Sequence, residues 1–378
     1  MYIKEISGGI VAPKGFKASG IHCGIRKNKE KKDLALIYAQ CLCAAGAVYT
    51  KNKVKGAPIE RCKENMRHNL AQAIICNSGN ANTCNADGFH IATQMCREVA
   101  NQLNIYENDI LIASTGVIGQ PLPLKPITDA MPQLVNSLSD DEKASDDAAH
   151  AIMTTDTVKK EISIEFKIGD TICKMGGIAK GSGMIHPNMA TMLVFVTTDA
   201  AISPKLVQKA LSTDVESSFN MVSVDGDTST NDTVLILASG RAKNKEIAKE
   251  DESYDQFCKA LSYVTTYLCK EIAKDGECAT KMIICNTHNS NDLKTARTVA
   301  KSVITSSLFK AAIFGKDANW GRILCAIGYA DCDFDIKKID VSLSSNAGKV
   351  DVCKDGHGID FSEEKALIIL NEAEITVD

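Results

Sequence analysis

Several patterns that mark whole classes of protein are missing from this sequence. No apolar run among its 378 residues approaches the length of a membrane-spanning helix, and the opening MYIKEISGGIVAP lacks the apolar centre of a secretory signal. The formal net charge is −4, which argues against nucleic acid or an anionic membrane surface as the main partner. We therefore expect a soluble cytoplasmic protein.

The sequence also lacks the signatures of metal and nucleotide sites. Its 15 cysteines are scattered, with Cys41 and Cys43 as the one close pair, and no CxxC spacing occurs. In a cytosolic chain we expect most of them to be reduced and buried as small hydrophobic side chains. Neither a Gly-rich P-loop nor a GxGxxG turn is present. We therefore predict no metal site and find no nucleotide-binding signature.

Apolar segments of two kinds alternate along the chain. With 44% hydrophobic residues the chain can bury a sizeable core, and its length allows two or three modest domains or lobes. The pattern of residues 34–50 indicates strands, whereas residues 88–103 carry apolar side chains at helical spacing. Further helices are predicted at 203–220, 257–274 and 291–309. Strands and helices that alternate without a repeat favour a mixed α/β (α+β) fold.

The Ala190-Thr191 junction carries the most informative local pattern. A glycine-rich approach ends there, and the apolar run Met192 to Val196 that follows indicates a buried strand. A self-cleaving N-terminal nucleophile needs this arrangement, because the threonine hydroxyl can attack the Ala190 carbonyl and hydrolysis of the ester would free an α-amine as general base. A threonine that simply begins a core strand fits the same residues and is the more frequent case. The dipeptide alone does not decide between them.

A second candidate lies at the end of the strand predicted for residues 109–113. Thr115 and Gly116 follow it directly. A strand that ends in Thr-Gly can aim a hydroxyl and a backbone N–H at one point, as a developing oxyanion requires. An ordinary strand-end turn explains the same dipeptide and is the commoner case.

Motifs spread over most of the chain resemble one enzyme family. In order they are GGIVAPKGFKASG at 8–20, KKDLALIYA at 31–39, NSGNAN at 77–82, STGVIGQ at 114–120, IMTTDT at 152–157, KGSGMIHPNMATMLVF at 180–195, FNMVSVDGDTSTNDT at 219–233, DGECATK at 275–281 and AAIFGKDANWGRILCAIGY at 311–329. Together they are similar to the glutamate N-acetyltransferases, also called ornithine acetyltransferases, of arginine biosynthesis. The segment at 180–195 is similar to the processing site of that family.

The resemblance implies a fold and a set of site residues. The fold would consist of layered sheets flanked by helices, with self-cleavage between Ala190 and Thr191 giving an α chain of residues 1–190 and a β chain of residues 191–378. Thr191 would be the nucleophile, and Thr115 and Gly116 would form the oxyanion hole. The same comparison places three further residues in contact with substrate, namely Thr154, Lys180 and Glu277.

The resemblance also implies a reaction. The acetyl group of N2-acetylornithine would pass to Thr191 and then to glutamate, without a dissociable cofactor. Some members of the family also use acetyl-coenzyme A, whereas others use N2-acetylornithine alone. No residue of this sequence distinguishes these two kinds of member. The partners would be these small molecules, and two α and two β chains would assemble as a heterotetramer.

Two alternatives stay open. Water could resolve the same acyl-enzyme, as in an N-terminal-nucleophile aminopeptidase or amidase. In the family, a segment beyond the strand that matches residues 374–377 supplies an asparagine and a threonine to the substrate site, whereas this sequence ends at Asp378. An inactive processed scaffold is therefore the second alternative.

Overall fold

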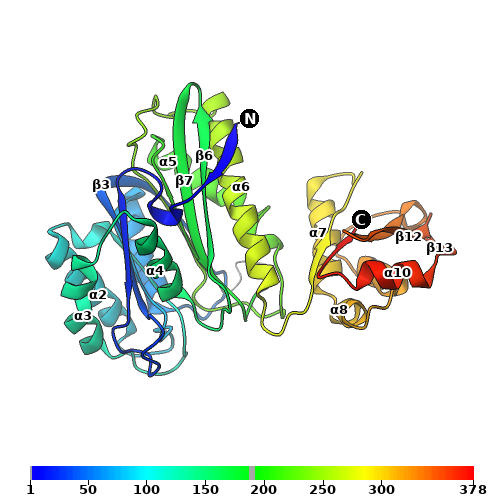
Figure 1. Ribbon diagram of the computed structural model, residues 1–378, viewed down its shortest axis with the longest axis horizontal. Helices are drawn as coiled ribbons and strands as arrows, with labels where there is room; N and C mark the ends of the chain where they lie inside the picture. The colour runs from blue at the N-terminus through cyan, green and yellow to red at the C-terminus, as the bar shows by residue number, and fades with distance from the viewer. Residues whose placement is uncertain (1, 187–191) are drawn as a thin grey trace. The chain divides into compact units, whose positions relative to one another are not determined.

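The computed structural model describes residues 2–186 and 192–378 and divides into two compact units (Figure 1). Unit 1 comprises Met1–Val222 and Asp227–Glu277, and unit 2 comprises Ser223–Gly226 and Cys278–Asp378. Both predicted chains contribute to unit 1, because the predicted cleavage position falls inside it. The boundary between the units therefore does not coincide with that position.

Unit 1 is built on a sheet in which nine strands are described. Their order is β1-β6-β7-β8-β9-β3-β4-β5, and β2 pairs with β3. In β3, residues 34–39 pair with β2 and residues 44–49 pair with β9. The pairing of β3 with β4 has a register shift between Tyr38 and Cys43. This long strand thus joins two parts of the sheet. The strands are β1 (Ile3–Ile6), β2 (Phe16–Ile21), β3 (Leu34–Tyr49), β4 (Leu70–Asn77), β5 (Ile110–Ser114), β6 (Lys160–Ile168), β7 (Thr171–Lys180), β8 (Leu193–Thr198) and β9 (Thr233–Ala238).

Strand β8 lies at the centre of unit 1. All its side chains are buried, since the sheet is covered on both faces here and the Leu-Val-Phe-Val run suits such a strand. It pairs antiparallel with β7 and parallel with β9, so that Leu193 lies opposite Lys180 on one side and Thr233 on the other. The buried strand predicted after Thr191 is confirmed.

Helices flank the sheet on both sides (Figure 1). Helices α2 and α3 lie on one side of β3 and α6 lies beyond β6 and β7; Leu268 and Val264 of α6 fill the space next to Gly177 of β7. Side chains from both parts of the sheet share one core, including Leu36, Phe195 and Leu235. The mixed α/β fold and the helix at 88–103 are confirmed. The helices are α1 (Ala57–Asn65), α2 (Gly88–Leu103), α3 (Leu124–Asn136), α4 (Glu142–Ile152), α5 (Pro204–Asp214) and α6 (Glu252–Lys274), with short 3-10 turns at Gly9–Val11, Met66–His68, Glu107–Asp109 and Phe219–Met221.

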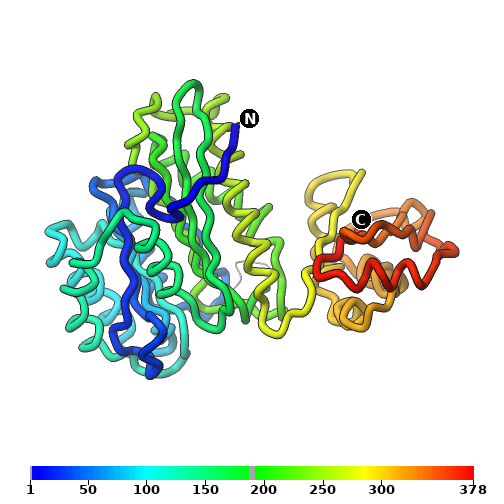
Figure 2. Tube along the Cα trace, in the orientation of Figure 1, coloured from blue at the N-terminus to red at the C-terminus, as the bar shows by residue number. Residues whose placement is uncertain are grey.

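Unit 2 has its own sheet and core, and Figure 2 traces it from yellow to red. The sheet order is β10-β14-β11-β12-β13. The single helix predicted at 291–309 is wrong, because the chain is extended at Ser306, whose hydroxyl accepts a hydrogen bond from Phe309 N at 3.2 Å and begins a second helix. The elements are β10 (Met282–Cys285), β11 (Val341–Ser345), β12 (Gly348–Lys354), β13 (His357–Gly358), β14 (Glu374–Val377), α7 (Leu293–Thr305), α8 (Ser307–Phe314), α9 (Trp320–Gly328) and α10 (Glu363–Leu370), with a 3-10 turn at Ile336–Lys338.

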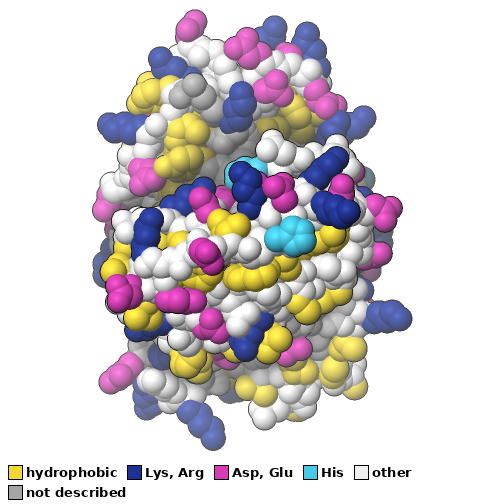
Figure 3. All heavy atoms as spheres, turned by 90° about the vertical axis from the view of Figure 1, so that its right-hand side faces the viewer, with side chains coloured by type: hydrophobic (Ala, Val, Ile, Leu, Met, Phe, Trp, Pro, Cys, Tyr) yellow, Lys and Arg dark blue, Asp and Glu magenta, His cyan; other side chains and the backbone are white. Residues whose placement is uncertain are grey.

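Charges of both signs are mixed on the face shown in Figure 3, where Lys and Arg lie among Asp and Glu. Of the helices that the structure describes, none has the length and apolarity needed to cross a membrane.

Candidate active site

Two of the predicted site residues meet at the ends of strands from different parts of the sheet. Lys180 is the last residue of β7, and Thr115 directly follows β5. The Lys180 ammonium donates a hydrogen bond to the Thr115 hydroxyl at 3.4 Å, and the two residues are 2% and 5% exposed. A cation and a hydroxyl thus converge in a buried place.

The Thr115-Gly116 turn requires its glycine. Gly116 has φ +128°, and a Cβ atom there would lie 2.6 Å from the carbonyl carbon of Gly79. The Thr115 N–H is already used, donating to the Asn77 carbonyl at 2.9 Å. None of the described residues accepts a hydrogen bond from the Gly116 N–H. The Gly116 N–H and the Thr115 hydroxyl are therefore the two donors that the turn can offer to an oxyanion.

Lys180 is a buried cation whose charge is offset by few neighbouring groups. Among the described residues, Thr115 is its one hydrogen-bond partner, and the bond is long. Burial lowers the pKa of Lys180, although the nearby Asp156 carboxylate opposes that shift. An ammonium held this way favours an incoming carboxylate, because the two charges would attract strongly in a poorly hydrated place.

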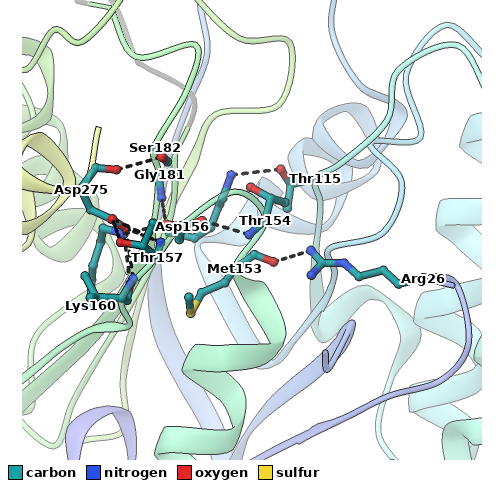
Figure 4. A network of polar contacts seen from close by, with 12 residues as sticks. Arg26, Thr115, Met153, Thr154, Asp156, Thr157, Lys160, Gly181, Ser182 and Asp275 are labelled. Carbon is teal, nitrogen blue, oxygen red and sulfur yellow. Dashed lines mark hydrogen bonds and ion pairs between the residues drawn. The ribbon is translucent and has the colours of Figure 1, made fainter. Parts of the chain in front are cut away.

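Asp156 connects the Thr154 loop to the segment that follows Lys180 (Figure 4). Its Oδ1 accepts hydrogen bonds from Gly181 N and from the Lys160 ammonium, each at 2.7 Å, and its Oδ2 accepts from Thr154 N at 2.9 Å. Burial disfavours the charged carboxylate, but the charges of Lys180 and Lys160 outweigh it and lower the pKa of Asp156. The carboxylate therefore fixes Thr154 and the end of β7 together.

Lys160 extends this network to the end of α6. Its side chain is fully buried, and its ammonium also donates to Asp275 Oδ2 at 2.6 Å. Asp275 in turn accepts from Thr157 N at 3.0 Å, and its carbonyl accepts from the Ser182 hydroxyl at 2.8 Å. Burial opposes ionisation here as well, but Lys160 and Thr157 lower the pKa of Asp275. One buried lysine thus holds two carboxylates that lie far apart in the sequence.

Glu277 lies beside the segment that follows Lys180. Its N–H donates to the Ser182 carbonyl at 3.0 Å, and a Cβ atom on Gly183 would lie 2.6 Å from the Glu277 carboxyl group. The side chain is exposed. Within the described part of the chain, no hydrogen bond joins Glu277 to Lys180 or Thr115. The structure brings Thr115 and Lys180 together, ties Thr154 to them through Asp156, and leaves Glu277 at the edge.

The predicted cleavage pair, Ala190 and Thr191, lies outside the described residues. The description resumes at Met192, whose N–H belongs to the peptide group shared with Thr191. This N–H donates to Asp232 Oδ1 at 3.2 Å, and Asp232 is 1% exposed. The described residues contain no group of three or more His, Cys, Asp and Glu side chains that could hold a metal ion.

Comparison with known proteins agrees with the motifs. The chain matches the model of the ArgJ family over residues 17–378. It is 48% identical over 373 residues to the arginine biosynthesis bifunctional protein ArgJ of Caldanaerobacter subterraneus subsp. tengcongensis, covering 98% of this chain and 92% of that protein. The chain belongs to the ArgJ family. The resemblance stated from the sequence motifs is confirmed.

Other ArgJ proteins are similar over comparable lengths. Arginine biosynthesis bifunctional protein ArgJ 1 of Clostridium acetobutylicum is 47% identical over 366 residues, which is 96% of this chain and 88% of that protein. A solved structure, ornithine acetyltransferase complexed with ornithine from Mycobacterium tuberculosis, is 32% identical with a TM-score of 0.46, and the match covers 49% of this chain and 98% of that one.

Four charged residues of this ArgJ site were missed in the sequence. Asp156, Asp232 and Asp275 all lie within quoted motifs, but as single acidic residues in polar turns they carry no sign of burial. Lys160 begins the alternating pattern of β6 and has the ordinary appearance of a solvated strand end. The motifs were the sequence signal that could have found the three carboxylates. Asp156 and Asp275 lie within four residues of a predicted substrate ligand, and Asp232 lies next to the strand that pairs with β8.

Proposed function

We propose that this ArgJ-family chain is an acetyltransferase of arginine biosynthesis that transfers the acetyl group of N2-acetylornithine to glutamate. Relatives that are 41–48% identical are named arginine biosynthesis bifunctional proteins, which supports the pathway. The observation that carries the proposal is the contact between the buried Lys180 ammonium and the Thr115 hydroxyl at 3.4 Å. It combines a cation for a substrate carboxylate with a donor for an oxyanion.

The proposed reaction begins with self-cleavage between Ala190 and Thr191. The Thr191 hydroxyl then attacks the acetyl carbonyl of N2-acetylornithine, and its proton passes to the α-amine of the same residue. Thr115 and Gly116 donate hydrogen bonds to the oxyanion. The C–N bond breaks, the proton moves to the leaving nitrogen, and ornithine departs. The amine of glutamate attacks the acetyl-Thr191 ester, which releases N-acetylglutamate and restores the hydroxyl.

One pocket would serve both halves of this reaction. Ornithine and glutamate derivatives each carry an α-carboxylate, and we assign it to Lys180, with Thr154 and Glu277 as further contacts. The relatives are named bifunctional. The proposal therefore includes acetyl-coenzyme A as a second acetyl donor. The proposal also includes an α chain of residues 1–190 and a β chain of residues 191–378, which assemble as a heterotetramer in the cytoplasm. The family resemblance supports these points.

Intact-protein mass spectrometry before and after incubation with N-acetylornithine tests this function. We expect two fragments that divide between residues 190 and 191, with one added acetyl group on the second fragment alone. Addition of glutamate should remove that acetyl group as N-acetylglutamate. A single unmodified chain would contradict the proposal. Release of acetate at the same rate with and without glutamate would instead identify an amidase.

Thr115→Ala should reduce acetyl transfer by about 10²–10³-fold in kcat, because one oxyanion donor is lost. The KM for N-acetylornithine should change little, since this hydrogen bond forms in the transition state rather than with bound substrate. Steady-state kinetics on the cleaved enzyme measures both constants. Thr115→Ser keeps a hydroxyl and is the matched control, expected within about tenfold of the wild type. Equal rates for the alanine and serine variants would remove Thr115 from the oxyanion hole.

A further inference from the structure

Asn231 carries a buried side-chain amide to which the proposed reaction gives no part. It stands two residues before β9 and is 5% exposed. Its Nδ2 donates hydrogen bonds to the Ser114 carbonyl at 2.9 Å and to the Ala81 carbonyl at 2.6 Å. Its Oδ1 accepts hydrogen bonds from the hydroxyl groups of Thr83 and Thr230, each at 2.6 Å. Both donors and both acceptor positions of the amide are therefore used.

The surroundings of this amide fix its orientation. A carbonyl oxygen accepts hydrogen bonds and cannot donate them, so the carbonyls of Ser114 and Ala81 must face the NH2 group. An amide turned by half a rotation would bring its oxygen against both carbonyl oxygens, which would repel it. The chain also packs closely here, because a Cβ atom on Gly56 would lie 2.6 Å from Asn231 Nδ2. The side chain thus has one orientation, in which it donates to two backbone carbonyls.

The first of these carbonyls belongs to the peptide group that enters the oxyanion turn. Ser114 is the last residue of β5, and its carbonyl shares a peptide group with the N–H of Thr115. That N–H donates to the Asn77 carbonyl at 2.9 Å, while Asn231 holds the carbonyl end of the same group. A planar peptide group that is bound at both ends cannot rotate without breaking a hydrogen bond. The backbone from which the Thr115 hydroxyl projects is therefore fixed.

The second carbonyl leads to the other side of the turn. Ala81 N donates to the carbonyl of Val117 at 2.9 Å, and Val117 directly follows Gly116. The peptide group shared by Thr115 and Gly116 stands between these two held positions. Its N–H is the one that donates to none of the described residues. One side-chain amide thus secures the turn on both sides of its free donor.

We propose that Asn231 is a positioning residue of the acyl-transfer centre, whose amide holds the Thr115-Gly116 turn so that the hydroxyl and the free N–H point to one place. This inference rests on the proposed function. The carbonyl oxygen of the acetyl group gains negative charge in the reaction, and donors that are fixed in advance stabilise it without having to reorient. Asn231 itself forms no covalent bond and exchanges no proton. It belongs to the predicted β chain and the turn to the predicted α chain, so these hydrogen bonds would join the two chains after cleavage.

Asn231→Ala tests this role. Both carbonyls lose their donor and the turn gains freedom, so kcat for acetyl transfer should fall about 10–100-fold. The KM for N-acetylornithine should change little, because the hydrogen bonds to the oxyanion form in the transition state. Steady-state kinetics on the cleaved enzyme measures both constants. An unchanged kcat overturns the proposal.

A double-mutant cycle with Thr115→Ala separates positioning from general destabilisation. If Asn231 acts through the Thr115 hydroxyl, the loss of its amide matters less once that hydroxyl is absent. We therefore expect Asn231→Ala to lower kcat by no more than about threefold in the Thr115→Ala background. The remaining reduction would come from the Gly116 N–H. If the double variant instead shows the product of the two single reductions, the two residues act independently and the proposal is wrong.

Asn65→Ala is the matched control. Asn65 is 6% exposed, and its Nδ2 also donates to two backbone carbonyls, those of Ile110 at 2.6 Å and Glu107 at 3.3 Å. These carbonyls lie at the beginning of β5 rather than at its end. We expect this variant to keep the wild-type kcat even where its free energy of unfolding falls as far as that of Asn231→Ala. A purely structural role for the asparagines bonded to β5 would lower the kcat of both variants alike and would overturn the proposal.

The outcomes separate this inference from the function on which it rests. A cleaved, active wild type in which Asn231→Ala and Thr115→Ala act independently overturns the role of Asn231 alone. A wild type that neither cleaves nor transfers acetyl groups overturns both. If Asn231→Ala does not fold, the cycle is measured with Thr83→Val, which removes one of the two hydroxyl groups that orient the amide. A smaller reduction in kcat that disappears in the Thr115→Ala background supports the proposal, and no reduction or an independent one overturns it.

Discussion

Thr191→Ala leaves a single uncleaved chain, with acetyl transfer reduced on the order of 10⁶-fold, as for other covalent enzymes that lose their nucleophile. Alanine has no hydroxyl to attack the Ala190 carbonyl, so neither the ester intermediate nor the free α-amine can form. The same side chain would carry the acetyl group, so processing and transfer fail together. Intact-protein mass spectrometry and an assay for N-acetylglutamate measure the two losses.

Thr191→Ser is the control for this variant. A serine hydroxyl can perform the same attack, so we expect cleavage at the same bond and acetylation of the second fragment, both more slowly than in the wild type. Two fragments from Thr191→Ala would show that another group cleaves the chain and would overturn the assignment of the nucleophile.

Lys160→Met should destabilise the protein by about 3–5 kcal/mol in free energy of unfolding. Methionine is close to lysine in size, so packing is largely kept, but the carboxylates of Asp156 and Asp275 lose their shared buried cation at 2.7 and 2.6 Å. Asp156 then keeps only the charge of Lys180, and the largely buried Asp275 carboxylate loses the cation that holds it. Urea unfolding at neutral pH, where both carboxylates are ionised in the wild type, measures the loss.

The neighbouring lysine gives a matched control for Lys160→Met. Lys159 pairs with Asp146 at 2.6 Å and Glu161 at 3.0 Å, but its side chain is 39% exposed, so Lys159→Met should cost less than about 1 kcal/mol. Adding Asp156→Asn and Asp275→Asn to Lys160→Met should recover part of the lost stability. Similar losses for Lys159→Met and Lys160→Met would mean that the buried carboxylates are not held by Lys160.

Two elements with a strong apolar pattern were predicted correctly from the sequence, whereas the helix predicted at 203–220 ends at Asp214. The helix at 88–103 has its bounds as predicted, because Ile91, Met95 and Val99 recur at helical spacing and all three are buried. The strand after Thr191 was equally clear, since a run of β-branched and aromatic residues suits a strand buried on both faces.

Where a cap overrides the apolar period, the prediction failed. The pattern of 291–309 continues smoothly through Ser306, yet this serine turns the chain and caps α8. Helix α3 was not predicted from the sequence; Pro126 lies in its first turn, and the helix continues through Pro132. Local propensity could not show that burial of Ile127, Met131 and Leu134 outweighs those prolines.

The site was predicted in part for a related reason. Motifs identified Thr115, Thr154 and Lys180, but their proximity depends on how β5 and β7 are placed within the sheet. The pairing of Lys160 with Asp275 could not be found by spacing, since the two residues lie 115 residues apart in the sequence. A buried ion pair of this kind depends on the fold, and no periodic pattern in the sequence indicates it.

The strand order has a consequence for refolding. Strands β8 and β9 lie between β7 and β3, so after the proposed cleavage the second chain would contribute two central strands held on both sides by strands of the first. The uncleaved precursor can fold in a unimolecular reaction. Once cleaved and denatured, the two chains would have to meet in solution, and reassembly would become second order in concentration. The Ala190-Thr191 peptide bond would then be needed for the first folding event only, and the mature protein would persist through slow unfolding rather than through reversible equilibrium.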